Sequence, residues 1–580
     1  MTKRRGLALV LACLAPVVSG CLGIPDDGPV VEAPTRVDPN EELGYYNDPP
    51  PPTPGEQPAD IVRGFLDALT AIPVQTNTAE EYLTSTAASS WQPQRTTITY
   101  GAASLPEGSN RVSVELSGAN HLDSGGRWLG PLPADERVLT YTMQREDGEW
   151  RIATLPDALV VPETWFGQAF RRVSLYYLDP SAQIMVPEPV FLPRGDQLTT
   201  ALVTELIQGP ARGLRGEVEQ SFIPPGVDVE LSVTVSEAGI ADIRLTGGVA
   251  MPSERDAALM VAQLTWTLSQ DSALTGLRIS INGEPVLLSE GEPVFAMDRG
   301  RFYDPTGFDA TSQLFALREG RLVAGEPGDL AQTDGPMGDQ DLDVGAISAD
   351  LTGTRVAGVR TREDRILVTD VRDPEAAVTE VVRGGTRLLP PVWDFADRMW
   401  IVNRPPGDAE LSVRAGGRVR PVRVPGVSGE EVSRVLVSRD GSRLAAVLDR
   451  GADDRIVVSR IRYDSRGRVA GGTRARAISW EDQSRADVID IGWSSPTSLV
   501  VLHRLSGDLT QVETLPVDGA PAGLTGLSVT LQGPVRGLAS SPRETDPVLV
   551  HTRDGLLDVR SGSEVVLPGT GELVSPTYVG

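Results

Sequence analysis

The chain has 580 residues, 40% hydrophobic and 23% charged, a composition typical of folded globular domains. At roughly 100 to 200 residues per domain, this length predicts three or more domains. The formal net charge of −26 argues against binding to nucleic acid and against adsorption on anionic lipid by charge attraction. Lys3 is the only lysine, so catalytic mechanisms that need a lysine amine are excluded for the rest of the chain.

Residues 1–20 have the organisation of a bacterial secretory signal. A basic start containing Lys3 precedes an apolar run from Leu7 to Val18, which is too short to span a membrane. The sequence Val18-Ser19-Gly20-Cys21 resembles a lipobox, although the family pattern prefers Leu where Val18 stands. The resemblance implies cleavage between Gly20 and Cys21, and attachment of diacylglycerol and an N-acyl chain to Cys21. The alternative is an ordinary cleaved signal in which Cys21 is incidental.

Residues 21–57 are predicted to form a lipid-bearing cysteine followed by an acidic, proline-rich linker. The run from Asp48 to Pro54 contains five prolines, which favour an extended and semi-rigid chain. The other cysteine, Cys13, lies in the signal, so no disulfide or cysteine zinc site is expected in the mature chain. We therefore expect a chain held by lipid at the extracytoplasmic face of the cell membrane.

Residues 58–168 are predicted to form an α+β domain. The spacing of Val62, Phe65, Leu66 and Leu69 predicts a helix. Alternating apolar residues around Val114 and Tyr141 then predict strands, with a hairpin at Asp147-Gly148. We expect one helix to cap one curved antiparallel sheet. This order of elements resembles the cone-shaped domains similar to nuclear transport factor 2.

Residues 169–298 are predicted to form an α/β domain. A helix is expected to end at Gly209-Pro210, and a second helix is expected to begin near Ser253, with Asp256 at capping-box spacing. The unbroken alternation from Val227 to Val235 predicts a single strand.

Six short segments of this region stand in the order found in the GerMN domain of spore-germination proteins. The resemblance implies an α/β envelope-protein module with no established catalytic residues. The matching segments are Leu175–Tyr177, Leu206–Pro210, Ile223–Gly226, Ala241–Ile243, Gln263–Leu268 and Ile281–Gly283.

Residues 299–580 are predicted to form an all-β propeller of about six blades. Trp393–Arg404 aligns without gaps to Trp493–Arg504, at an offset of 100 residues. That offset equals two units of about 50 residues, a length typical of propeller blades. Ser438–Ala445 also matches Ser348–Ala357 after a two-residue insertion. The alternative is an array of β-sandwiches, which would not require a repeat of this period.

No residue is assigned a catalytic, cofactor-binding or metal-binding role. The chain has three histidines, His121, His503 and His551, and the last two occupy similar positions in predicted strands. Two imidazoles at the mouth of a central channel could bind a metal. We favour repeat-equivalent strand residues instead, because Asn403 stands in the first repeat where His503 stands in the second.

Two further pairs of residues have a structural and a functional interpretation. Asp350 and Asp440 resemble the aspartates of sialidase propeller hairpins, but they lack the tryptophan and glycine spacing, so we interpret them as turn residues. Trp393 and Trp493 could be ligand platforms, but their repeated position favours core packing. Paired carboxylates for glycoside hydrolysis cannot be chosen among 79 acidic residues.

The order of lipobox, acidic linker, α+β domain, GerMN-like domain and propeller resembles the LpqB lipoproteins of actinobacteria over essentially the whole chain. The resemblance implies a non-enzymatic accessory protein of a two-component system. Its partner would be the extracytoplasmic domain of the MtrB sensor histidine kinase, with effects on cell division and the envelope. A lipoprotein that binds a cell-wall polymer, peptidoglycan or another glycan, is one alternative, and an envelope glycoside hydrolase is another. No cofactor is expected.

Overall fold

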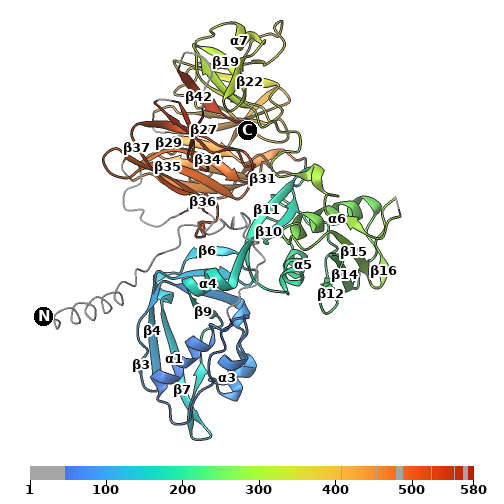
Figure 1. The fold of residues 1–580 in the computed structure, drawn as a ribbon, viewed down its shortest axis with the longest axis vertical. Coiled ribbons are helices and arrows are strands. Elements are labelled where there is room, and N and C mark those ends of the chain that lie inside the picture. The colour runs from blue at the N-terminus through green and yellow to red at the C-terminus, as the bar shows by residue number, and fades with distance from the viewer. Residues whose placement is uncertain are drawn as a thin grey trace, which may run out of the picture. The chain divides into compact units, whose positions relative to one another are not determined.

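The computed structural model describes residues 46–289, 291–406, 408–451, 453–478, 487–523, 526–553, 555–565 and 572–580. These residues form an N-terminal α+β domain, an α/β domain and a β-propeller (Figure 1). Within those ranges, no helix has the length and apolarity needed to cross a membrane. The predicted signal, Gly20, Cys21 and most of the predicted linker lie outside the described residues.

The N-terminal domain packs helices against two sheets, where the sequence predicted one. The first sheet has the order β6-β5-β1-β9, and the second has the order β2-β4-β7-β8, with β3 paired to β4. The chain passes between the sheets at Gly101 and again at Gly118, and Gly101 N donates to the Ser117 carbonyl, next to Gly118, at 3.0 Å. Gly118 has φ of 61°, a conformation that most residues avoid.

The elements of this domain are α1 (Pro58–Ala68), α2 (Asn77–Glu80), α3 (Ser85–Ser90), η1 (Pro93–Arg95), β1 (Thr96–Tyr100), β2 (Ala102–Ala103), β3 (Glu107–Gly108), β4 (Arg111–Ser117), β5 (Asn120–Asp123), β6 (Trp128–Pro131), η2 (Ala134–Glu136), β7 (Val138–Glu146), β8 (Glu149–Thr154), β9 (Leu159–Pro162) and α4 (Glu163–Ala169).

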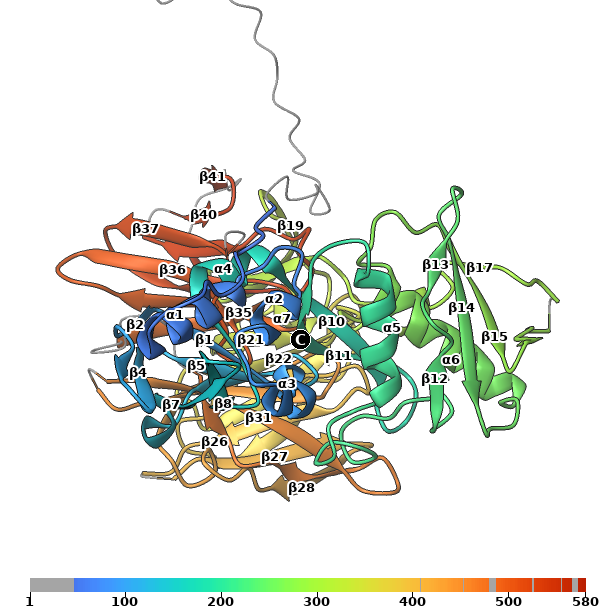
Figure 2. The ribbon, with the colours of Figure 1, turned by 90° about the horizontal axis from the view of Figure 1, so that it is seen from below.

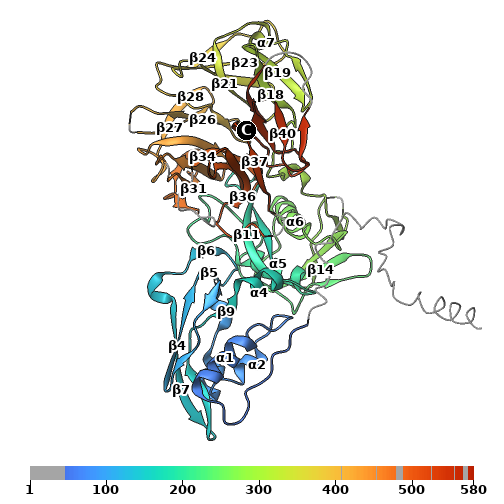
Figure 3. The same cartoon turned by 60° about the vertical axis from the view of Figure 1, so that its left-hand side comes forward.

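Helix α1 supplies the centre of the N-terminal core. The predicted apolar stripe is confirmed, because Val62, Phe65, Leu66 and Leu69 are all buried. The Phe65 ring packs edge-on against Trp91 and Tyr141, with centroid distances of 5.5 and 6.0 Å. Figure 3 shows α1 beside the long strands β4 and β7.

The α/β domain contains a hairpin of β10 and β11 and a separate sheet of order β12-β14-β15-β16. Strands β14 and β15 are parallel, and α6 makes the crossover that a parallel pair requires (Figure 2). The predicted caps are confirmed: α5 ends before Gly209, and the Ser253 hydroxyl accepts a hydrogen bond from Asp256 N. The elements are β10 (Phe170–Leu178), β11 (Met185–Pro193), α5 (Leu198–Gln208), β12 (Val227–Val229), β13 (Thr234–Val235), β14 (Ile240–Gly247), α6 (Glu254–Leu268), β15 (Gly276–Ile281), β16 (Glu284–Pro285) and β17 (Phe295–Ala296).

The prediction of one strand from Val227 to Val235 is wrong. The chain bends at Leu231, which has φ of 63° and is 98% exposed. Ser232 N donates to Glu230 O at 2.8 Å, which closes a three-residue turn around Leu231. Alternation of apolar residues shows which face each residue occupies, but it does not show whether the strand is continuous.

The propeller has six sheets within the described residues, and in each sheet consecutive strands are antiparallel. The innermost strands β42, β21, β25, β29, β34 and β38 contact one another in a closed ring. The last strand, β42, pairs with β18 of the first sheet, and Gly580 N donates to Ala349 O of the next sheet at 3.1 Å. The ends of the propeller are therefore joined by the end of the chain.

The elements from residue 299 onward are η3 (Arg301–Tyr303), β18 (Leu314–Arg318), β19 (Arg321–Glu326), β20 (Asp329–Gln332), α7 (Pro336–Asp339), β21 (Val344–Ala349), β22 (Arg355–Arg360), β23 (Arg365–Asp370), β24 (Thr379–Arg383), β25 (Val392–Trp393), β26 (Met399–Asn403), β27 (Glu410–Ala415), β28 (Arg418–Val422), β29 (Val432–Val437), β30 (Arg443–Leu448), β31 (Arg455–Tyr463), β32 (Val469–Gly472), β33 (Arg476–Ala477), β34 (Asp487–Ser495), β35 (Ser498–Arg504), β36 (Leu509–Pro516), β37 (Ser528–Gln532), β38 (Val535–Ala539), β39 (Leu549–Thr552), β40 (Leu556–Asp558), β41 (Ser563–Val565) and β42 (Leu573–Thr577).

Candidate functional site

The propeller has two ends that differ in their contacts. The turns between the first and second strands of the sheets lie at one end, here called the docking end, and include residues 350–354, 394–398 and 438–442. Because neighbouring strands are antiparallel, the turns between the second and third strands, such as 361–364 and 505–508, lie at the opposite, distal end.

Aspartates hold the turns of the docking end. The Asp350 carboxylate accepts hydrogen bonds from the backbone N–H groups of Thr354 and Arg355, at 2.9 and 3.0 Å. The Asp440 carboxylate accepts from Ser442 N at 2.7 Å. Both aspartates are buried, so their interpretation as turn residues is confirmed.

The repeated tryptophans belong to the cores of the sheets. Trp393 is 1% exposed and Trp493 is 7% exposed, and each packs among apolar residues. The prediction of core packing is confirmed, and neither ring is available as a ligand platform.

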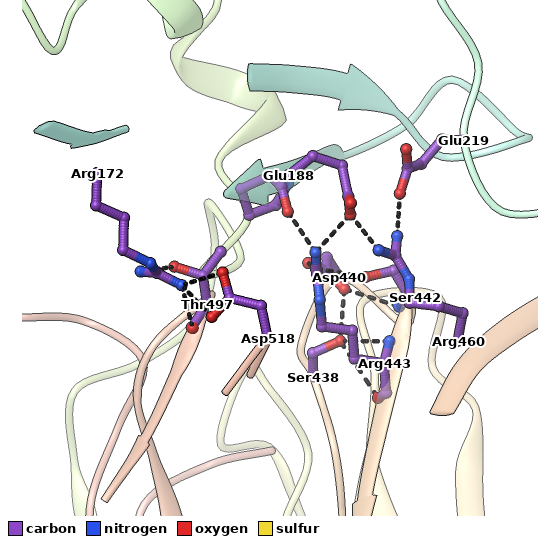
Figure 4. Close-up of polar contacts among 11 residues, drawn as sticks. Arg172, Glu188, Glu219, Ser438, Asp440, Ser442, Arg443, Arg460, Thr497 and Asp518 are labelled. Carbon is purple, nitrogen blue, oxygen red and sulfur yellow. Dashed lines mark hydrogen bonds and ion pairs between the residues drawn. The ribbon is translucent and has the colours of Figure 1, made fainter. Parts of the chain in front are cut away.

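A buried ion cluster joins the docking end to the β10-β11 hairpin (Figure 4). Arg443, at the start of β30, donates from Nη2 to the Pro187 carbonyl and to Glu188, each at 2.5 Å. Arg460 stands opposite Arg443 on β31 and pairs with both Glu188 and Glu219. Residues more than 200 positions apart thus meet in one buried group.

The two glutamates of the ion cluster titrate in opposite directions. Burial acts to raise the pKa of Glu188, but Arg460 and Arg443 outweigh it and lower that pKa to about 2. Burial raises the pKa of Glu219 well above its usual value, and the negative charge of Glu188 raises it further. Arg460 acts in the opposite direction, but it is shared with Glu188 and does not outweigh these two effects. Two guanidinium groups then face the carboxylates of Glu188 and Asp440, the latter 3.9 Å from Arg443.

Other contacts extend this junction. Arg172 of β10 reaches Asp518 at 3.3 Å and the Thr497 hydroxyl at 3.4 Å. Tyr463 N donates to the Glu217 carbonyl at 2.8 Å. Arg439 is 2% exposed and donates to the Thr306 carbonyl at 3.1 Å, and burial lowers its pKa to about 9. The docking end is therefore fixed to the residues that precede the propeller.

A cleft of about 600 Å³ lies beside the ion cluster. Its lining includes Arg127 and Trp128 of the N-terminal domain, Leu214 of the α/β domain, and Arg474 and Ile478 of the propeller. Pockets for small molecules commonly have volumes of about 300–1,000 Å³ and often lie between domains.

Among the described residues, the histidines are not grouped with other side chains as metal ligands would be. His503 and His551 lie on β35 and β39, the second strands of neighbouring sheets, as equivalent positions in a repeat would. His503 Nε2 lies 2.7 Å from Glu513, burial and Arg536 lower the pKa of His551, and His121 Nδ1 lies 3.0 Å from the Gly130 carbonyl in the first domain. In the part of the chain that the structure describes, no three His, Cys, Asp or Glu side chains are grouped to hold a metal ion.

The ion cluster was not predicted from the sequence. Its signal is a charged residue beside or within an apolar strand: Arg443 precedes the apolar run Leu444–Leu448, and Glu188 interrupts β11. The predicted lipidation residue Cys21 and the cleavage site at Gly20 lie outside the described residues and remain predictions.

Comparison with known proteins finds three family models along the chain. Residues 51–167 match the N-terminal domain of lipoprotein LpqB, residues 174–287 match a sporulation and spore germination model, and residues 320–572 match the LpqB β-propeller domain.

Two relatives named lipoprotein LpqB match over nearly their full lengths. The protein of Streptomyces avermitilis is 28% identical, covering 100% of this chain and 99% of its own. The protein of Mycolicibacterium smegmatis is 27% identical, covering 98% and 100%. Among solved structures, TolB from Acinetobacter baumannii is 14% identical with a TM-score of 0.31, covering 57% of this chain and 86% of its own. The first GerMN domain of GerM from Bacillus subtilis is 20% identical with a TM-score of 0.19, covering 22% and 97%.

Proposed function

The chain belongs to the LpqB family of actinobacterial lipoproteins, and from this we propose that it binds the extracytoplasmic domain of an MtrB-like sensor histidine kinase. In this proposal it is an accessory protein that modulates signalling to the cell envelope and to division, without catalysis. The binding surface is the distal end of the propeller.

The distal end is proposed as the binding surface because the docking end of the propeller is already in contact with the α/β domain. The docking end is held by the buried cluster around Arg443 and by Arg439. At the distal end, exposed ion pairs instead connect the loops, as in Arg387–Glu431 and Arg450–Glu430, at 3.5 and 2.8 Å. Such a rigid, loop-lined surface is suited to a protein partner.

The proposed lipid anchor at Cys21 would add to the affinity. A chain tethered to the outer face of the cell membrane meets another membrane protein at a raised effective concentration. A modest interaction between the propeller and a kinase domain would then suffice for a stable association in the membrane.

Binding of the full chain, held in a lipid nanodisc, to the purified kinase ectodomain tests the proposal. We expect saturable binding, and we expect Arg450→Glu at the distal end to weaken it at least about tenfold, because charge reversal at an interface creates a repulsive contact. Arg63→Glu, on an exposed face of the N-terminal domain, is the matched control and should leave the affinity unchanged. Absence of binding by the unmodified chain would contradict the proposal.

The cell-wall alternative gives a different outcome in the same system. A lipoprotein that binds peptidoglycan or another glycan should sediment with purified cell walls in the absence of any kinase. Sedimentation combined with failure to bind the ectodomain would replace the proposed function with this alternative.

A further inference from the structure

The cleft beside the ion cluster is lined by residues of three domains. Trp128 and Leu129 come from β6, Glu188 and Leu214 come from the α/β domain, and Val517 comes from the propeller. Arg476 of β33 crosses toward the N-terminal domain, since its Nη2 donates to the Leu129 carbonyl at 2.8 Å. A molecule in this cleft would therefore touch all three domains at once.

The charge of the lining is opposite to that of the chain. Five arginines and three acidic residues line the cleft, whereas the formal charge of the chain is −26. Arg443 and Arg460 pair with Glu188, Arg127 lies 3.8 Å from Asp123, and Asp518 pairs with Arg172. Arg474 and Arg476 are exposed, and neither forms an ion pair with any residue in the described ranges.

A buried donor at the cleft also lacks an acceptor. Trp128 is 5% exposed and lines the cleft, and within the described residues its Nε1 has no hydrogen-bond partner. Arg127 Nε is buried and unsatisfied in the same way. Buried donors without acceptors are uncommon in folded proteins, so an acceptor supplied by a ligand would satisfy them.

Most of the remaining lining is apolar. The Trp128 ring is accompanied by Val458, Ile478 and Val517, whose side chains can cover a hydrocarbon or aromatic group. We propose that this cleft binds a small organic anion, with a carboxylate or phosphate facing Arg474 and Arg476 and an apolar body against Trp128. Arginine is suited to this role because its planar guanidinium binds either group through two hydrogen bonds.

Isothermal titration of the full chain in a lipid nanodisc tests this site, with phenyl phosphate and benzoate as probes. We expect saturable binding of at least one aromatic anion, and weaker binding of inorganic phosphate and of benzyl alcohol, which each lack one half of the proposed ligand. The double variant Arg474→Gln/Arg476→Gln should lower the affinity at least about tenfold, because it removes both charge-assisted contacts. Trp128→Phe, which keeps an aromatic ring but removes the indole N–H donor, should also weaken binding.

Arg466→Gln provides the matched control, since Arg466 is an exposed arginine of the turn between β31 and β32 and does not line the cleft. It should bind the probes as the unmodified chain does, and circular dichroism should show all variants folded. The proposal is overturned if neither aromatic anion binds, if inorganic phosphate binds equally well, or if the double variant binds unchanged. These results do not depend on the kinase, so they are separable from the proposed function.

Discussion

Arg443 and Arg460 place two guanidinium groups in the interior of the junction, and both pair with the Glu188 carboxylate of the α/β domain. Moving a charge out of water costs several kcal/mol, which an ion partner and additional hydrogen bonds can offset. Loss of one partner therefore leaves an uncompensated charge. The loss of one partner should therefore cost much more in the buried cluster than in the exposed ion pairs of the same junction.

Arg443→Met is expected to lower the free energy of unfolding by about 3–5 kcal/mol, because the buried Asp440 carboxylate then loses the guanidinium it pairs with, while Glu188 keeps only Arg460. Urea denaturation of the full chain measures the change. Arg462→Met is the control: Arg462 pairs with Glu217 at the same junction, but both side chains are about half exposed, so about 0–1 kcal/mol is expected. Equal losses in the two variants would contradict burial of the cluster.

Glu188→Gln and Glu219→Gln are expected to differ in their dependence on pH. The folded pKa of Glu188, about 2, lies below its ordinary 4.5, so its ionised form stabilises the fold above pH 4.5, and that contribution is lost as the pH falls toward 2. The folded pKa of Glu219 is raised, so its contribution is full below 4.5 and is lost as the pH rises through the raised value.

Glu188→Gln should therefore lower the melting temperature at pH 7. Glu219→Gln mimics the neutral acid, so it should leave that temperature unchanged or raise it, and it should reduce the loss of stability at alkaline pH. Calorimetry between pH 4 and 9 provides the measurement. An equal loss at pH 7 in both variants would show that both carboxyls are ionised.

Among the helices, the features that depend on nearby residues were predicted correctly from the sequence. The stripe of α1, the end of α5 at Gly209 and the Ser253 cap all depend on residues within one or two turns. The break at Leu231 comes from a three-residue turn that leaves the alternation of apolar residues uninterrupted, so that alternation could not show it. The division of the N-terminal sheet depends on pairing between strands far apart in the chain, such as β1 with β9.

The same distinction applies to the site. The turn aspartates and the buried tryptophans were predictable because they recur within a repeat. Arg443 and Glu188 stand 255 positions apart and meet only because one domain docks on another. No local sequence pattern shows that Arg443 pairs with Glu188. A charged residue beside or within an apolar strand indicates only that a buried charge needs an oppositely charged partner.

Strand β42 is expected to be essential for the propeller, since it pairs with β18 and completes the inner ring. Deletion of residues 573–580 removes the buried side chains of Leu573, Tyr578 and Val579, each worth about 1.5–3 kcal/mol. The propeller should lose at least about 5 kcal/mol and become sensitive to limited proteolysis. Val574→Ser, at a 42% exposed position of the same strand, should change stability by about 0.5 kcal/mol or less. A truncated chain as resistant as the intact one would contradict closure by this strand.

In the proposed function, the whole molecule combines a lipid anchor at Cys21 with protein surfaces that bind a partner. Cys21→Ala is expected to abolish incorporation of labelled palmitate and to release the protein from the membrane fraction, because no other residue is proposed to carry lipid. Cys13→Ala, in the predicted signal, should leave the lipid in place. Continued labelling of the Cys21 variant would contradict the proposed anchor.

In-cell photocrosslinking from the distal end of the propeller is the most direct test of the proposed contact with a sensor kinase. A photoreactive residue at position 450, in the turn between β30 and β31, is expected to capture the extracytoplasmic domain of a sensor histidine kinase, identified by mass spectrometry. The same group at position 63 of the N-terminal domain should not capture it. Recovery of no kinase peptide from position 450, in cells where the lipoprotein and the kinase are both present, would contradict the proposed function.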